Sequence, residues 1–199
     1  MKRFVLIMSL AMSISAFAGY TYTITDGMDF GGLTLTGTQS LLMTGGGGDS
    51  LSLLGSSSAV IQGTAPYDQT VYPSGGIRDL SVGGYAHLDF SGGEVYEISI
   101  GSYATAVLSG GTIQRLKTSQ LVGLQVDPYI EIICKDWDYN TVTKMLTGIW
   151  ANDTTFAIQL VDVANYTPTI DDITFTIIPE PATMLLLGAG GLFLRRKQK

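Results

Sequence analysis

Apolar and polar residues alternate with a period of two through most of the chain, which predicts short β-strands. Segments rich in glycine and serine separate these strands and predict tight turns. The pattern also repeats, because residues 33–37 (LTLTG) recur 18 positions later as residues 51–55 (LSLLG). The same offset separates Leu80, Ile98 and Leu116. A fixed offset of this length indicates a repeat architecture.

Each repeat holds two short strands and is too small to bury an apolar face alone, so successive repeats must stack. We therefore predict an all-β fold whose main part is a single-stranded β-solenoid of about five 18-residue coils. Equivalent residues should then lie above one another in columns. The expected inward columns are Leu33, Leu51, Leu80, Ile98 and Leu116, then Met43, Ile61, Phe90, Leu108 and Val126, with a further column of Ile77, Val95 and Ile113; the expected outward column is Ser40, Ser58, His87, Thr105 and Gly123.

The main alternative is a β-sandwich of short strands, because that fold also has many glycine turns and no helical periodicity. An offset held over several columns favours the solenoid. Glycine pairs should occupy the corners of the coils, where positive φ angles are needed. The segment 64–74, with Pro66 and Pro73, interrupts the repeat and is predicted to be a loop that leaves one corner.

The repeat fades after Pro128, and residues 129–178 are predicted to form a β cap over the open end of the stack. The expected elements of this cap are a strand at Tyr129–Cys134, an acidic aromatic turn at Lys135–Asn140, a strand or irregular stretch at Thr141–Trp150, a hairpin ending in Thr155–Val161, and a last strand at Asp172–Ile178.

The N-terminus has the three parts of a secretory signal peptide. Lys2 and Arg3 are basic, Phe4–Ile14 is apolar, and Ala16-Phe17-Ala18 is a small-x-small cleavage site. We expect residues 1–18 to enter the secretion machinery and signal peptidase to cut between Ala18 and Gly19.

The C-terminus carries a second signal-like segment. Pro179, Glu180 and Pro181 precede the uncharged, mostly apolar segment 182–194, and the basic residues Arg195, Arg196 and Lys197 follow as a stop. Thirteen residues make a helix roughly 20 Å long, short for a bilayer core of about 30 Å. We therefore expect a short transmembrane helix that holds the protein only transiently, with the basic end on the cytoplasmic side.

These three parts, in this order, resemble the PEP-CTERM sorting signal of Gram-negative-type bacteria. The resemblance covers only the tail at residues 179–199. It implies that a membrane-embedded cysteine protease or transpeptidase, the exosortase, recognises Pro179, Glu180 and Pro181. It also implies a link to exopolysaccharide and biofilm matrix. It implies little about the activity of the rest of the chain, because members of this family carry many unrelated domains before the tail.

The net charge of the body, which we define as the residues between the two terminal signals, excludes some partners. Residues 19–178 keep 5 of the 11 basic and 16 of the 17 acidic residues, which gives a formal net charge of −11. Such a surface repels nucleic acid and anionic lipid, so we expect no nucleic-acid partner.

Candidate chemistry is sparse. Asp136 and Asp138 flank Trp137, and paired carboxylates beside an aromatic ring are typical of glycosidases and sugar-stacking sites. A solvated loop is the simpler interpretation, and the EF-hand pattern is missing, so no metal site is predicted. The only histidine, His87, is expected to face solvent, and the only cysteine, Cys134, to be a small buried apolar residue.

No catalytic set and no cofactor emerge from these residues. We predict a non-enzymatic exported protein with a structural or interaction role, which is transiently anchored in the inner membrane before it reaches the cell surface or extracellular matrix. The alternative is a polysaccharide-binding or polysaccharide-degrading enzyme. The predicted domains are the signal peptide (1–18), the solenoid (19–128), the cap (129–178) and the sorting tail (179–199).

Overall fold

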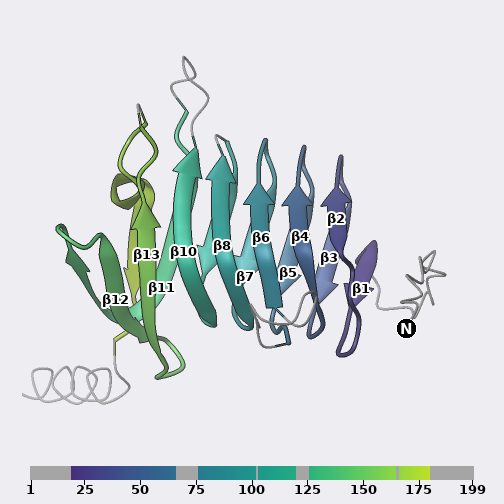
Figure 1. Ribbon diagram of the computed structural model, residues 1–199, viewed down its shortest axis with the longest axis horizontal. Helices are drawn as coiled ribbons and strands as arrows, with labels where there is room; N and C mark the ends of the chain where they lie inside the picture. Colours follow the sequence, from purple (N-terminus) through teal and green to yellow (C-terminus); the bar gives the residue numbers. More distant parts are fainter. Residues whose placement is uncertain (1–18, 66–75, 102, 120–125, 165, 180–199) are drawn as a thin grey trace, which may run out of the picture.

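The strands of the repeat region alternate along the chain between two parallel ladders (Figure 1). The computed structural model describes residues 19–65, 76–101, 103–119, 126–164 and 166–179. The first ladder contains β2 (Gly32–Leu35), β4 (Gly47–Leu53), β6 (Gly76–Val82), β8 (Glu94–Gly101) and β10 (Thr112–Ser119). The second contains β1 (Tyr22–Ile24), β3 (Ser40–Met43), β5 (Ser58–Ile61), β7 (His87–Phe90) and β9 (Thr105–Leu108). Every pairing within a ladder is parallel.

The register of the first ladder confirms the predicted columns. Leu80 pairs with Leu51 on one side and with Ile98 on the other, and Ile98 pairs with Leu116. The column of Ile77, Val95 and Ile113 is confirmed in the same strands. Since equivalent residues pair across parallel strands, side chains of one kind stack in each column.

A bend in the first ladder explains how two of these columns share one core. Ile77 and Leu80 are both buried although they lie three positions apart, which strict alternation would forbid. The pairing register skips the intervening residue Arg78, as it skips the equivalent Tyr96 in β8. Two successive side chains therefore face outward at the bend, and the strand then resumes its inward pattern.

The second ladder follows the prediction until its last member. Met43, Ile61, Phe90 and Leu108 pair in sequence and are fully buried. The expected next member, Val126, is wrong, because it precedes the strand and Ile132 pairs with Leu108 instead. The segment after β10 is thus longer than one repeat allows. Gly123 of the predicted outward column lies outside the described residues, and Tyr129 pairs with Thr105 at that position.

Glycines permit the tight stacking of the corners. Gly37, Gly55 and Gly84 occupy equivalent turns with φ angles of 62°, 71° and 66°, a region that favours glycine. A Cβ on Gly84 would also lie only 3.2 Å from the backbone of Gly55 in the turn beneath it. The expectation that glycine pairs take the corners is confirmed by the positive φ angles of Gly31, Gly84, Gly93 and Gly111, whereas Gly37 and Gly55 are single glycines at such turns. The predicted loop at 64–74 falls mostly outside the described residues.

The C-terminal part is a meander that joins the two ladders. Its elements are β11 (Tyr129–Asn140), β12 (Met145–Trp150), β13 (Thr155–Val161), the short 3-10 helix η1 (Thr169–Asp172) and β14 (Ile173–Ile177). β11 continues the second ladder beside β9, and β13 continues the first ladder beside β10. β12 pairs antiparallel with both β11 and β13, so the described strands form one continuous sheet.

One expectation for this region needs correction. Lys135–Asn140 is not a turn but the second half of β11, because Asp136–Asn140 pairs along its length with β12. The chain turns later, between Asn140 and Met145. The predicted hairpin into β13 is confirmed by the antiparallel pairing of β12 and β13, and the last predicted strand is confirmed as β14.

Buried apolar residues of both ladders and the meander form one hydrophobic core, which runs the length of the stack. Within the described ranges, no helix is long and apolar enough to span a bilayer. The predicted transmembrane segment at 182–194 lies outside those ranges.

Candidate functional site

The acidic aromatic cluster lies on the second half of β11. A register shift between Cys134 and Asp136 marks a bulge, after which Asp136, Trp137 and Asp138 pair with β12. Bulges bend a strand and redirect its side chains. All three residues of the cluster are exposed, as a surface site requires.

Cross-strand pairing defines which residues share a face with the two carboxylates. Asp138 lies opposite Thr147 of β12, which lies opposite Ala157 of β13. Asp136 begins a second row, through Ile149 to Thr155. Directly opposed residues point to the same side of an antiparallel sheet. Asp136 and Asp138 therefore share the outer face of the meander, and Trp137 points to the other face.

Trp137 stacks against Phe175 of β14, with ring centroids 3.9 Å apart and ring planes within 8° of parallel. One face of the indole is thus covered by another aromatic ring, although 39% of Trp137 stays exposed. The aromatic ring and the two carboxylates of this cluster are adjacent in sequence but lie on opposite faces of the sheet. A sugar stacked on Trp137 would not lie against Asp136 and Asp138.

The geometry of the carboxylates gives no support to acid–base catalysis. The Cα atoms of residues i and i+2 of a strand lie about 6.8 Å apart, a spacing at which two carboxyl groups could serve as the pair of an inverting glycosidase. A general acid of this type, however, needs a desolvated carboxyl group, whereas Asp136 and Asp138 are both exposed. Within the described part of the chain, the only hydrogen bond of either side chain is the one that Asp136 Oδ1 accepts from the Trp137 amide at 2.9 Å. Among the described residues, no group of three or more acidic, histidine or cysteine side chains is arranged to hold a metal ion.

Cys134 is fully buried between its neighbours on β12 and β14, Trp150 and Ile177, which confirms the expectation of a buried residue. Burial raises the pKa of its thiol, and the negative charge of Asp136 raises it further. A raised pKa lowers the fraction of reactive thiolate at neutral pH.

His87 faces outward, as predicted, with 42% of its side chain exposed. Its Nδ1 lies 2.6 Å from the Thr105 hydroxyl, and its Nε2 lies 3.1 Å from Asp89 Oδ1. These partners tie β7 to β9 across the outer face of the second ladder. The His87 ring therefore joins the hydroxyl of Thr105 to the carboxylate of Asp89 on this exposed face.

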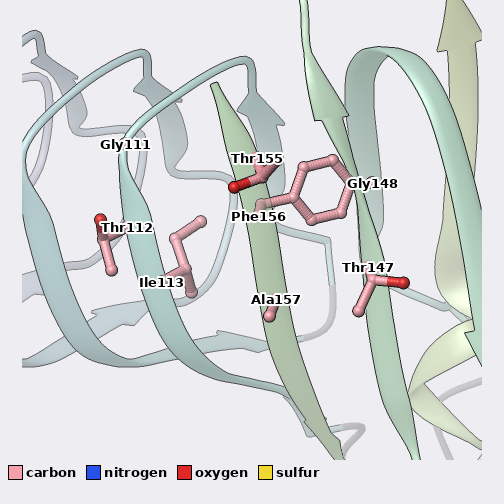
Figure 2. Close-up of a pocket in the computed structure, with 8 residues that line it drawn as sticks. All are labelled: Gly111, Thr112, Ile113, Thr147, Gly148, Thr155, Phe156 and Ala157. Atoms are coloured by element: carbon pink, nitrogen blue, oxygen red, sulfur yellow. The ribbon is translucent and has the colours of Figure 1, made fainter. Parts of the chain in front are cut away.

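The structure also contains a groove that the sequence pattern did not indicate (Figure 2). It is open, has a volume of about 520 Å³ and lies among β10, β12 and β13. Its lining residues are Gly111, Thr112, Ile113, Thr147, Gly148, Thr155, Phe156 and Ala157.

The groove forms because β10 and β13 pair over only part of their lengths. Their pairing begins at Arg115 and Gln159 and continues toward the strand ends. Before that point the two strands diverge, and the groove occupies the gap between Ile113 and Ala157. These strands are distant in sequence, so no local pattern marks their divergence.

Two packed contacts hold the walls of the groove in place. The indole Nε1 of Trp150 donates a hydrogen bond of 2.9 Å to the carbonyl oxygen of Gly111. On the other wall, the ring of Phe156 lies where a side chain at position 148 would be, since a Cβ on Gly148 would come within 2.5 Å of it. Both walls therefore belong to the rigid end of the core.

Of the predicted sorting and cleavage residues, the structure describes Gly19 and Pro179, and both are exposed. The remaining ones lie outside the described residues: Ala18, Glu180, Pro181, Arg195, Arg196 and Lys197. β14 ends two residues before Pro179, and the Ile178 amide donates a 2.9 Å hydrogen bond to the Cys134 carbonyl. The core thus fixes the point where the tail begins.

Comparison with known families identifies the tail. Residues 178–197 match the PEP-CTERM protein-sorting motif, as the sequence resemblance predicted. No curated protein and no solved structure matches the chain. The motif supports sorting to the cell surface by an exosortase, a membrane enzyme.

Proposed function

We propose that this PEP-CTERM protein is exported, anchored briefly in the inner membrane, and delivered to the cell surface or extracellular matrix, where it has a structural or interaction role. The observation that carries this proposal is the motif match at residues 178–197. Pro179, the first residue of the Pro-Glu-Pro step, is exposed and lies two residues after the end of β14, as recognition by an exosortase requires.

For the body at 19–128 we propose a β-solenoid. The parallel register supports it, because Leu51, Leu80, Ile98 and Leu116 stack in successive strands at the spacing of the sequence repeat. A β-sandwich consists of antiparallel sheets, whereas antiparallel pairing in the described residues is confined to β12 and its two neighbours.

For residues 129–178 we propose the role of a cap. β11 and β13 each extend one ladder, β12 bridges them, and the buried Trp150 packs on the end of the core. Such a cover pairs the edges of β9 and β10, which would otherwise be free to associate with another chain. The cap also determines where the tail leaves the body.

Processing provides the test of the sorting proposal. In an exosortase-containing host, mass spectrometry of the surface or secreted fraction should find an N-terminus at Gly19 and no basic tail. A chain lacking residues 179–199 should lose surface retention, and Glu180→Gln should slow processing. Gln198→Ala, which lies just outside the matched motif, is the control and should be processed normally. An intact tail in the mature surface protein contradicts the proposal.

A second candidate function is polysaccharide binding or degradation through Asp136, Trp137 and Asp138. It is favoured by the exposure of all three residues on one strand. The opposite faces of Trp137 and the carboxylates favour binding over catalysis, so we propose that the protein is not an enzyme. The double variant Asp136→Asn/Asp138→Asn tests this candidate. If it binds and turns over extracted exopolysaccharide as the unchanged protein does, the candidate is wrong.

A further inference from the structure

The groove among β10, β12 and β13 combines an apolar floor with free hydroxyl groups. Ile113 and Phe156 are 1% and 6% exposed and form the floor, whereas Thr112 and Thr155 are exposed at the sides. Neither threonine hydroxyl forms a hydrogen bond with the described residues. Figure 2 shows the Thr155 hydroxyl directed into the gap toward β10. A hydroxyl both donates and accepts, so each is available to a polar ligand.

The charges around the groove select a neutral ligand. None of its eight lining residues is charged. The basic residues that follow on β10 are already paired, since both Arg115 and Lys117 contact Glu97. The formal net charge of −11 over residues 19–178 repels anions. A cation would find no carboxylate in the lining, since the neighbouring Asp138, opposite Thr147, lies outside it and is exposed to solvent.

The groove narrows along its length, which favours a compact ligand over an extended peptide. β10 and β13 are separated at Ile113 and Ala157 but pair directly at Arg115 and Gln159. A peptide strand needs about 4.8 Å on each side along its whole length, so it cannot continue where the two strands meet. A short polyhydroxylated unit needs no continuing register. It also matches a site with an apolar floor and a few polar groups.

We propose that this groove binds a neutral saccharide, as one or two sugar units of a glycan chain. The Thr112 and Thr155 hydroxyls hydrogen-bond to the sugar hydroxyls, and the apolar face of the ring lies over Ile113 and Phe156. The volume of about 520 Å³ falls within the usual range of ligand sites. This proposal goes beyond the sorting function, and because its test measures binding alone, its failure leaves the sorting proposal intact.

The test is titration of the full-length, ¹⁵N-labelled protein with defined oligosaccharides, observed by NMR. A zwitterionic detergent is used, because glycoside detergents would compete for the groove. The neutral probes are maltohexaose, cellohexaose, laminarihexaose and mannohexaose. Hexagalacturonate and an uncharged hexapeptide probe the other ligand classes. At least one neutral probe should shift the amide signals of Gly111, Ile113 and Ala157. If no neutral probe binds, if binding maps elsewhere, or if the acidic sugar or the peptide binds more tightly, the proposal is wrong.

Variants then separate the groove from the rest of the surface. Thr112→Val/Thr155→Val keeps the side-chain shape, removes both hydroxyls and should weaken binding about tenfold. Ala157→Trp fills the groove from an exposed position and should abolish binding. Thr34→Val, at an exposed position on β2 far along the stack, is the matched control and should bind normally. Unchanged affinity in Ala157→Trp overturns the proposal even if the double threonine variant fails to fold.

Discussion

The indole nitrogen of Trp150 and the carbonyl oxygen of Gly111 are joined by a hydrogen bond of 2.9 Å between the end of β12 and the turn before β10. Trp150 is also fully buried, and its ring centroid lies 4.2 Å from that of Phe156. One side chain therefore fills the end of the hydrophobic core and ties the meander to the first ladder. Loss of the Trp150 side-chain volume and loss of its hydrogen bond should each lower the free energy of unfolding.

Replacement of Trp150 should be among the most destabilising changes in the chain. Trp150→Ala should lower the free energy of unfolding by about 3–5 kcal/mol, because it leaves a cavity in a packed core. Trp150→Phe should cost about 1–3 kcal/mol, because the Gly111 carbonyl loses its donor. Urea unfolding monitored by circular dichroism measures both. Trp137→Phe, at the exposed indole, is the control, and an equal cost at both tryptophans would contradict this assignment.

Gly148 should not tolerate a side chain. Its Cβ would overlap the Asp136 carbonyl oxygen and come within 2.5 Å of the Phe156 ring, which is held by the core and cannot easily move. We expect Gly148→Ala to lower the free energy of unfolding by about 1–3 kcal/mol through overpacking.

Gly83→Ala is the matched control, since the nearest atom to its added Cβ is a flexible Leu54 methyl at 3.5 Å. Its effect should stay within about 0.5 kcal/mol in the same urea assay. Equal stability of the two alanine variants would show that the Phe156 ring can shift at little cost.

Most of what could be predicted from the sequence concerns the columns of equivalent residues in the two ladders. Leu80, Ile98 and Leu116 pair as expected because a parallel stack preserves the spacing of the repeat directly. The prediction for Val126 is wrong because the repeat ends before it, and Ile132 takes the position. The offset between repeats does not by itself show where the stacked repeats end and the C-terminal meander begins.

The candidate site was harder to predict because tertiary pairing overrides local pattern there. Lys135–Asn140 is acidic and polar, features typical of a turn, yet it is a strand because β12 pairs with it. The groove depends on the divergence of β10 from β13, two strands that meet only in the folded chain. Its threonines and glycines look like ordinary strand and turn residues in the sequence.

The inward columns should be far more sensitive to truncation than the outward ones. Ile98 is fully buried and pairs with Leu80 and Leu116, so Ile98→Ala should cost about 2–5 kcal/mol. Ser99 is the next residue of β8 and points outward, so Ser99→Ala should change stability by less than about 0.5 kcal/mol. Thermal and urea unfolding give both values. Similar costs for the two variants would contradict the stacked core.

Asp172 should lower the free energy of unfolding at neutral pH, because its buried carboxyl group is ionised there. Burial raises the pKa of this carboxyl group, the charges of Asp127 and Asp171 raise it further, and a hydrogen bond with Thr118 opposes them. Its Oδ2 is buried and has no hydrogen-bond partner among the described residues. Because the folded pKa exceeds the unfolded value of about 3.9, the stability contributed by this group is fully present below that pH. It is lost as the pH rises through the folded pKa, where the buried carboxylate ionises.

Asp172→Asn removes this ionisation while keeping the shape of the side chain. The variant should therefore be more stable than the unchanged protein at pH 7, and its advantage should shrink as the pH falls toward about 3, where Asp172 is protonated in both folded and unfolded chains. Urea unfolding at pH values from about 3 to 7 measures the difference. Asp171→Asn, at the exposed neighbour, should have the smaller effect at pH 7. An Asp172→Asn variant that loses stability at pH 7 would mean that the carboxylate makes a favourable contact that outweighs its burial.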